Sequence, residues 1–167
     1  MKEDNGALLL DDDDIDTMTN KYLVFKLCSE NYGIDIQYVK EIIELQKIIS
    51  IPDMPEYIRG VINLRGMVIP VMDLRRRFHK ETKDFDDRTC IIVINIFEKN
   101  TGLIVDSVDE VVDIPETNIE PPPNYSSDLK SKNFIKGIGK FNNELKIILD
   151  LEKMIKEEDL DVNEPAV

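Results

Sequence analysis

The sequence contains no tryptophan, a single histidine and two cysteines, and each scarcity excludes a kind of site. His79 lies in a polar stretch without a nucleophile motif, so hydrolysis of the Ser-His-Asp or Cys-His type lacks its general base. Cys28 and Cys90 lie in apolar, strand-like stretches without a Cys-x-x-Cys motif. This predicts two buried thiols rather than a disulfide or a zinc site.

Long apolar runs are also absent. The N-terminal run Ala7–Leu10 is too short for a signal peptide, and no run reaches the roughly 18 residues of a membrane span. The chain has no phosphate-binding loop of the form G-x-x-x-x-G-K-S/T, and Gly137–Gly139 lacks the third glycine of a dinucleotide-binding turn. We therefore expect a cytoplasmic protein that is not an enzyme and that holds neither a metal nor a cofactor.

The net charge of −13 is concentrated at the two ends of the chain. Residues 1–16 hold seven acidic residues and one lysine, and residues 156–167 hold five acidic residues and one lysine. Residues 17–155 are left with a net charge of only −3. Acidic ends of this kind are typical of disordered segments that keep a protein in solution. Since no basic stripe is present, nucleic acid is not expected as a partner.

The sequence repeats itself at low identity. Residues 22–45 match residues 91–114 without a gap at an offset of 69, and residues 58–78 match residues 135–155 at an offset of 77. Two ungapped matches in the same order indicate an internal duplication. We expect an acidic N-terminal segment (1–19), a folded region (20–156) in which repeat one (about 20–80) and repeat two (about 88–156) are intertwined or related by a pseudo-two-fold axis, and an acidic tail (157–167).

Each repeat is predicted to consist mostly of short strands. Apolar and polar residues alternate from Leu23, Ser29–Asn31 forms a hairpin connection, and Gly33 begins the return strand. In the second repeat, Glu98–Gly102 has the same role. A helical turn over Pro55–Arg59, ended by Gly60, follows in the first repeat. Five short strands and a helical turn, present twice, suggest two small barrels of the SH3 size class.

The last strand pair of each repeat leads into a short helix. Its turn is Leu64–Gly66 in the first repeat and Asn142–Asn143 in the second, and Asp73 and Asp150 are the expected N-caps of the helices. Pro70 indicates that its strand lies at an edge or carries a bulge. The longest expected irregular stretch is 119–133.

The motif RGVINLRGMVIPVMDL (59–74), preceded by YLVFKLCSENYGIDIQYVKEII (22–43) and followed by GLIVDSVDEVVDI (102–114), resembles the chemotaxis coupling proteins of the CheW family. The resemblance covers about residues 20–156, in motif order and in spacing. It implies a mostly β fold of two SH3-like five-stranded barrels in tandem around a shared core, with short helices. It also implies a cytoplasmic, non-enzymatic adaptor that couples chemoreceptors to the histidine kinase CheA in chemotaxis signalling arrays.

The resemblance further implies the partners and their contact residues. The partners are the cytoplasmic tips of methyl-accepting chemoreceptors and the regulatory domain of CheA, so the membrane is reached only through receptors, and the free protein is monomeric. The receptor set, in a groove between the barrels, is Val39, Glu41, Gly60, Arg65 and Val111. The kinase set is Ile42 and Ile48 on one barrel, with Cys90, Glu120 and Tyr125 on the other.

Arg65 is a cation in an otherwise apolar stretch, and two interpretations of it remain open. An unpaired charge buried there would cost several kcal/mol. The resemblance pairs Arg65 with Glu41, and a carboxylate is the partner that a guanidinium binds best. The alternative is an arginine at the tip of a hairpin whose charge lies in solvent.

Two other functions are considered. The chain could be a receptor-coupling module from a larger signalling chain, although its short length and acidic ends argue against this. It could also be a small-molecule-binding pair of barrels, but the apolar strands carry no convergent polar residues of the kind that orient a ligand.

Overall fold

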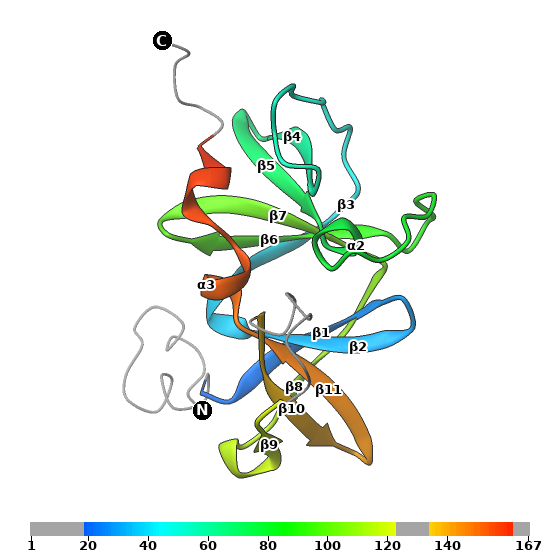
Figure 1. The fold of residues 1–167 in the computed structure, drawn as a ribbon, viewed down its shortest axis with the longest axis vertical. Coiled ribbons are helices and arrows are strands. Elements are labelled where there is room, and N and C mark those ends of the chain that lie inside the picture. The colour runs from blue at the N-terminus through cyan, green and yellow to red at the C-terminus, as the bar shows by residue number, and fades with distance from the viewer. Residues whose placement is uncertain (1–18, 123–133, 162–167) are drawn as a thin grey trace, which may run out of the picture.

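Two β-sheets make up most of the computed structural model, which describes residues 19–122 and 134–161. Each sheet forms a barrel, and the two barrels lie one above the other along the long axis of the molecule (Figure 1). The first barrel contains β3 (Val39–Glu44), β6 (Cys90–Ile96), β7 (Lys99–Val105), β5 (Met67–Asp73) and β4 (Ile58–Leu64), in that order. The second contains β8 (Ser107–Asp113), β1 (Lys21–Leu27), β2 (Glu30–Asp35), β11 (Glu144–Leu149), β10 (Ile135–Phe141) and β9 (Ile119–Glu120), in that order. The expected mostly β fold with two SH3-like barrels is confirmed.

The two barrels exchange strands. An offset of 69 places β1, β2 and β3 on β6, β7 and β8, and an offset of 77 places β4 and β5 on β10 and β11. When these equivalents are exchanged, the order β3-β6-β7-β5-β4 becomes β8-β1-β2-β11-β10. Each barrel thus takes one hairpin from the half of the chain that does not supply its other strands, through the parallel pairs β5–β7 and β2–β11. Neither barrel can form from one continuous half of the chain.

Short helices follow the last strand of each repeat, as expected. The α-helices are α2 (Leu74–Arg77) and α3 (Leu151–Met154), and both lie near the level at which the barrels meet (Figure 1). The Asp73 carboxylate accepts a hydrogen bond from the Arg75 N–H at 3.0 Å, and Asp150 accepts one from the Lys153 N–H at 3.2 Å. Three 3-10 helices complete the described elements: η2 (Ile36–Tyr38), η3 (Glu116–Asn118) and η5 (Glu157–Leu160).

Four strand pairs are joined by two-residue turns in which both residues have positive φ. This is the type I′ geometry, whose twist matches that of the flanking strands. The turns are Cys28–Ser29, Arg65–Gly66, Phe97–Glu98 and Asn142–Asn143. The expected turns at Ser29–Asn31 and Glu98–Gly102 were therefore placed one or more residues too late, since the return strands begin at Glu30 and Lys99. The turn expected at Asn142–Asn143 is confirmed. Cys28–Ser29 and Phe97–Glu98 contain neither glycine nor asparagine, which is why composition did not locate them.

The prediction of a helical turn that ends at Gly60 is wrong. Gly60 lies inside β4 with φ +148°, and a Cβ added there would lie 2.1 Å from the carbonyl oxygen of Ile49. Ile49 approaches so closely because it forms a two-hydrogen-bond bridge with Val61, at 2.8 and 2.9 Å. The glycine therefore permits the segment after β3 to close the first barrel against β4.

Pro70 does not lie on an edge strand, because β5 is paired with β4 on one side and with β7 on the other. It lies opposite Val61 of β4, and the pairing with β7 begins one residue later, at Val71. The missing N–H is thus placed just outside the β7 ladder, which is how a central strand accommodates the proline.

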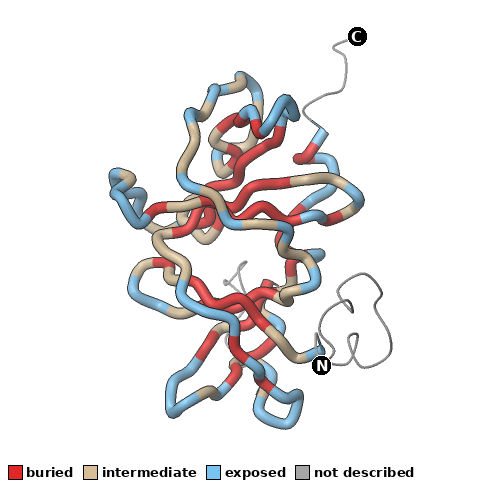
Figure 2. The backbone as a smooth tube through the Cα atoms, turned by 180° about the vertical axis from the view of Figure 1, so that it is seen from behind, coloured by how far each residue is buried: buried red, intermediate tan, exposed pale blue. Residues whose placement is uncertain are grey.

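Figure 2 shows buried residues along the strands of both barrels. They form three clusters, and the largest joins side chains of the two barrels. This inter-barrel core includes buried side chains from both sheets, from α2 and α3 and from η5. A second cluster fills the first barrel with aliphatic residues, and a smaller third cluster fills the second barrel. The expected shared core is therefore the main core of the molecule.

Three expectations about the cysteines, the C-terminal tail and the stretch from residue 119 are corrected. Cys28 and Cys90 are free thiols but only partly buried, because Cys28 lies in a hairpin turn and Cys90 at the start of a strand. Residues 157–161 are not a loose acidic tail: they include η5, and Leu160 is only 4% exposed. The stretch expected to be irregular from residue 119 begins with β9, which pairs with β10.

No helix in residues 19–122 and 134–161 combines the length and the apolar character that a membrane crossing requires.

Candidate functional site

Arg65 and Glu41 form an ion pair at one end of the first barrel. Arg65 lies in the β4–β5 turn with φ 51°, and its Nη2 donates a hydrogen bond to Oε2 of Glu41 in β3. The side chains are 65% and 35% exposed, respectively. Both interpretations of Arg65 are thus correct in part, since the residue sits at a hairpin tip and is also paired. A pair this exposed contributes about 0–1 kcal/mol to stability, so the fold does not depend on it.

The other members of the receptor set are divided between the two barrels. Gly60 is buried in β4 and closes the first barrel, Val39 begins β3 beside the inter-barrel core, and Val111 is 50% exposed on β8 of the second barrel. Val111 is the equivalent of Ile42 at the offset of 69. The structure therefore places Glu41, Gly60 and Arg65 on one barrel and Val111 on the other. That these residues contact a receptor stays a prediction.

The kinase set is not divided as expected. Cys90 was assigned to the opposite barrel from Ile42, but it begins β6, which pairs with β3 in the first barrel. The assignment is wrong because β6, although it belongs to the second repeat, is one of the exchanged strands. Ile48 is partly buried against the first-barrel core. Glu120 lies on β9 of the second barrel and pairs with Lys140 at 3.0 Å.

Tyr125, the remaining member of the kinase set, lies outside the described residues. The proposal that it anchors an interface stays a prediction.

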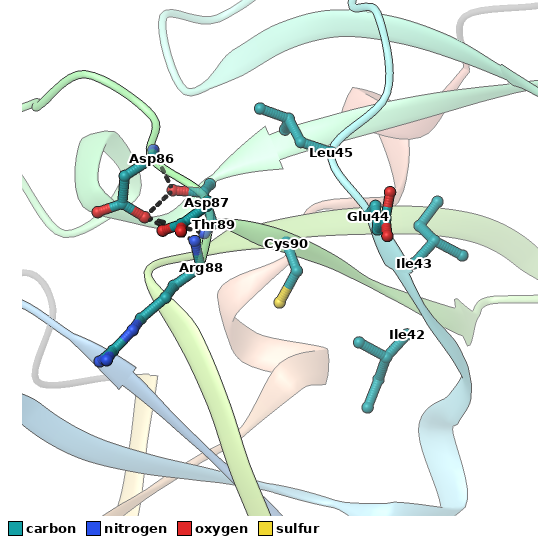
Figure 3. Close-up of a pocket in the computed structure, with 9 residues that line it drawn as sticks. All are labelled: Ile42, Ile43, Glu44, Leu45, Asp86, Asp87, Arg88, Thr89 and Cys90. Carbon is teal, nitrogen blue, oxygen red and sulfur yellow. Dashed lines mark hydrogen bonds between the residues drawn. The ribbon is translucent and has the colours of Figure 1, made fainter.

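A shallow pocket of about 520 Å³ brings Ile42 and Cys90 together (Figure 3). Its residues come from the end of β3 and from the segment that leads into β6. They are Ile42, Ile43, Glu44, Leu45, Asp86, Asp87, Arg88, Thr89 and Cys90. Ile42 is 45% exposed, so the pocket combines an accessible apolar side chain with a charged rim. Such a combination is typical of a protein-binding surface.

Asp86 shapes the rim of this pocket. Its carboxylate accepts hydrogen bonds from the backbone N–H groups of Arg88 and Thr89, at 2.9 and 3.2 Å (Figure 3). It accepts another from Lys83 Nζ at 3.1 Å. The Arg88 N–H and the Lys83 ammonium lower the pKa of Asp86 to about 2. The carboxylate is therefore charged at every physiological pH and acts as a turn-forming group rather than as an acid or base.

The pKa of Cys90 is raised, whereas that of Asp86 is lowered. Burial raises the pKa of its thiol, and the hydrogen bond with the backbone of Val108 only partly offsets this effect. A protonated thiol is a poor nucleophile and a poor metal ligand. In the part of the chain that the structure describes, no three His, Cys, Asp or Glu residues cluster in a way that could hold a metal ion.

Sequence reasoning missed an ion pair at the crossover between the barrels. Asp106, between β7 and β8, accepts hydrogen bonds from Nε and Nη2 of Arg75 at 2.9 and 2.6 Å and from the Cys28 N–H at 2.9 Å. Burial acts to raise the pKa of Asp106, but the bonds from Arg75 and Cys28 outweigh it and lower the pKa. The pair ties α2 of the first repeat to the crossover of the second. No local signal in the sequence links residues 31 positions apart.

Sequence reasoning also missed Arg77, which lies where the two barrels meet. The Arg77 guanidinium lies over the rings of Tyr57 and Phe134, 4.7 and 4.1 Å from their centroids, and donates two hydrogen bonds to the Met154 carbonyl. Tyr57 and Phe134 are equivalent at the offset of 77, as are Arg77 and Met154. Arg77 thus contacts the residue equivalent to itself, Met154, and both members of the equivalent pair Tyr57 and Phe134, and so links the two repeats. Arg77 is one of three consecutive arginines in LRRRF, and nothing in that segment indicates that it is the buried one.

Comparisons with known proteins match the whole folded region. The model of the CheW-like domain matches residues 21–159. The chemotaxis protein CheW of Klebsiella aerogenes is 33% identical over 145 residues, which are 87% of each chain. The chemotaxis protein CheW of Bacillus subtilis is 40% identical over 103 residues, 62% of this chain and 66% of that protein. The crystal structure of the scaffolding protein TtCheW from Thermoanaerobacter tengcongensis superposes with a TM-score of 0.76 at 38% identity, covering 86% of this chain and 97% of that chain.

Proposed function

This chain belongs to the CheW family, and from that premise we propose how it couples its partners. The family is one of scaffold and adaptor proteins, and the chain is a chemotaxis coupling adaptor. Its partners are the cytoplasmic tips of chemoreceptors and the regulatory domain of the histidine kinase CheA. It works in the cytoplasm and without catalysis. The match over residues 21–159 is the observation that carries this proposal.

The two sets of contact residues would have separate roles. The receptor set, centred on the Glu41–Arg65 pair, contacts receptor helices, while Ile42 and Cys90 in the 520 Å³ pocket contact the kinase. Glu120 and Tyr125 supply contacts from the second barrel. Receptor occupancy then changes kinase activity through the assembly, which requires different contacts with two states.

The binding unit is proposed to be the folded region alone. The family match ends at residue 159, and the packed residues up to Asp161 continue from α3. Deletion of residues 1–16 and 162–167 is expected to leave kinase affinity unchanged. A tenfold loss, or about 1.4 kcal/mol, would instead place acidic residues in the interface.

The alignment with the Klebsiella coupling protein covers 87% of that protein, and this supports the coupling adaptor over the receptor-coupling module as the proposed function.

Reconstitution of receptor-containing membranes with CheA and ATP tests the proposal. Phosphorylation of CheA is expected to respond to receptor only when this chain is added. The Arg65→Glu variant is expected to lose at least tenfold of this stimulation. Lys153→Glu, the same charge reversal at an exposed residue of α3 that belongs to neither contact set, is the matched control and should retain it. Equal stimulation by the wild type and by Arg65→Glu would remove Arg65 from the receptor site.

A further inference from the structure

The chain behaves differently after its two equivalent helices, α2 and α3. Among the described residues, only one flank of the inter-barrel seam is covered by the segment that follows its helix. After α2, His79 adopts φ 59° and the Lys80 N–H bonds back to the Arg75 carbonyl at 2.7 Å, so the chain turns away. After α3, the equivalent residue Lys156 has φ −90° and ψ 129°, so the chain runs on into η5. Only the flank beside α3 is therefore covered by the chain that leaves its helix. Residues 156–161 are called the strap.

Three consecutive residues hold the strap in place. The Tyr57 hydroxyl donates a 2.5 Å hydrogen bond to Asp159 Oδ2. Leu160 is 4% exposed and belongs to the inter-barrel core. Asp161 pairs with Lys99. The strap therefore binds its flank through one aliphatic anchor between two carboxylates.

The flank beside α2 carries a pocket of about 60 Å³. Its lining residues are Tyr32, Phe78, Lys80, Ile135 and Leu149. At the offsets of 69 and 77 they correspond to Thr101, Ile155, Glu157, Ile58 and Met72. Ile58, Met72 and Ile155 belong to the inter-barrel core, as Leu160 does. Tyr57 and Lys99, which bond to the strap, are the equivalents of Phe134 and Glu30, and Glu30 pairs with Lys80 of the pocket. The pocket therefore lies at the position equivalent to the flank that the strap covers.

The charges at the two flanks are reversed. On the strap side, Lys99 pairs with Glu157 at 3.9 Å, and on the pocket side the equivalent residues Glu30 and Lys80 pair at 3.8 Å. Glu30 at the pocket therefore takes the place of Lys99, the residue that binds Asp161 of the strap. Phe134 replaces Tyr57 and has no hydroxyl for a carboxylate such as that of Asp159.

We propose that this pocket, called the seam pocket, is a docking site for a segment of another protein. That segment presents an aliphatic residue the size of leucine, followed directly by lysine or arginine. The aliphatic side chain takes the place that Leu160 takes on the strap side, and the basic side chain pairs with Glu30 as Asp161 pairs with Lys99. A volume of about 60 Å³ suits a small aliphatic group and is far below the 300–1,000 Å³ of cofactor and drug sites. None of the pocket residues belongs to the receptor set or the kinase set.

Three peptides test this assignment on the full chain. They are acetyl-Gly-Ser-Leu-Lys-Val-Gly amide, the same peptide with aspartate in place of lysine, and the lysine peptide with alanine in place of leucine. Binding is followed by NMR through the methyl groups of Ile135 and Leu149. The Leu-Lys peptide is expected to shift both methyl groups at about 1 mM, with at least tenfold tighter binding than either of the other peptides.

A charge reversal at the pocket sharpens the test. Glu30 is an exposed residue at the start of β2, so Glu30→Lys should fold normally and should reverse the order, with the Leu-Asp peptide now binding more tightly. Glu110→Lys, the same charge change at an exposed residue of β8, should leave the order unchanged. The proposal is overturned if the peptides leave Ile135 and Leu149 unmoved, if the three bind equally, or if Glu30→Lys keeps the original order.

Discussion

The first barrel is filled by aliphatic side chains throughout, whereas several equivalent positions of the second barrel carry polar residues or glycine. Ile62, Ile69, Ile91 and Ile104 of the first barrel correspond to Gly139, Lys146, Tyr22 and Asp35 of the second. The core cluster of the second barrel is accordingly the smaller one. The same strand order is thus built on two interiors of unequal apolar content.

Lys146 illustrates the difference most clearly. It is 2% exposed, and its ammonium reaches Glu144 at 2.8 Å, a carboxylate that is itself 63% exposed. The aliphatic stem of the lysine fills the barrel while its charge emerges at the mouth. The hydrogen bond from Lys146 lowers the pKa of Glu144.

Tyr22 adds a second polar group to this interior. Burial raises the pKa of its hydroxyl, and the nearby carboxylates of Asp35 and Glu116 raise it further. The second barrel therefore gains less from its own interior and depends more on the inter-barrel core. Strand exchange makes the second barrel depend on the first, because its strands β1 and β2 are followed directly in the chain by β3 of the first barrel.

The largest expected effect is at the closure of the first barrel. Gly60→Ala should lower the free energy of unfolding by about 3–4 kcal/mol, because φ +148° is strained for alanine and the added Cβ meets the Ile49 carbonyl at 2.1 Å. Gly137→Ala, its equivalent in the second barrel, should cost about 2 kcal/mol, since its closest contact is the Ile119 Cγ2 at 2.6 Å. Urea unfolding measures both.

Gly66→Ala serves as the control for these closures. Its φ is +89° but nothing lies within 4 Å of the added Cβ, so the loss should be limited to about 1 kcal/mol of backbone strain. A loss for Gly66→Ala as large as that for Gly60→Ala would show that strain, rather than barrel closure, sets the cost at Gly60.

The next effect compares the two interiors directly. Ile69→Lys should lower the free energy of unfolding by about 3 kcal/mol, since it places an unpaired charge in an aliphatic core. Lys146→Ile should be neutral or should stabilise by about 1 kcal/mol, because Glu144 is 63% exposed and stays solvated without its partner, while isoleucine adds apolar contact inside the barrel. Thermal and urea unfolding measure both changes. A loss above about 2 kcal/mol for Lys146→Ile would show that the second barrel needs its polar interior.

A smaller effect concerns the strap. Tyr57→Phe should cost about 1 kcal/mol through the lost hydrogen bond to Asp159. Burial and this bond raise the pKa of Tyr57 to about 12, against about 10 in the unfolded chain. Since the protonated form is favoured in the fold, its contribution is complete below pH 10 and is lost as the pH rises towards 12.

Unfolding measured between pH 8 and 12 checks the strap prediction. Tyr57→Phe should flatten the decline above pH 10. Tyr38→Phe removes the more exposed Tyr38–Glu152 bond (3.1 Å) and should cost less than half as much at pH 8. If Tyr38→Phe lowers the free energy of unfolding more than Tyr57→Phe does, the Tyr57–Asp159 bond is not the more stabilising of the two.

The smallest stability effect is expected at the Glu41–Arg65 pair. Arg65→Glu should change the free energy of unfolding by less than about 1 kcal/mol, because Arg65 is well exposed and Glu41 is partly exposed. The double variant Glu41→Arg with Arg65→Glu should recover part of any loss, giving a favourable interaction energy in a double-mutant cycle. Strictly additive effects would mean that the pair has no energetic role.

Much of the local structure was predictable from the sequence, for reasons that act over a few residues. The alternation around Leu23 predicted β1, and the carboxylates of Asp73 and Asp150 predicted the starts of α2 and α3. The turns were placed less well. Cys28–Ser29 and Phe97–Glu98 adopt positive φ because the twist of a two-residue hairpin demands it, although no glycine or Asn-Gly pair marks them.

The candidate site was predictable only as far as the resemblance reached. The Glu41–Arg65 pair is present, but Cys90 lies beside Ile42 rather than on the opposite barrel. Its place depends on which barrel β6 joins, and the repeat allowed either arrangement. The tertiary structure decided this through the parallel pairing of β5 with β7.

By itself, the sequence determined the strands, the helix caps and the repeat, because these follow from patterns of adjacent residues. Only the tertiary structure decided the strand exchange, the burial of Arg77 between Tyr57 and Phe134, and the seating of Leu160 in the inter-barrel core. These features join residues far apart in the chain. Their energy comes from surfaces that exist only once both barrels have formed, so no local pattern could encode them.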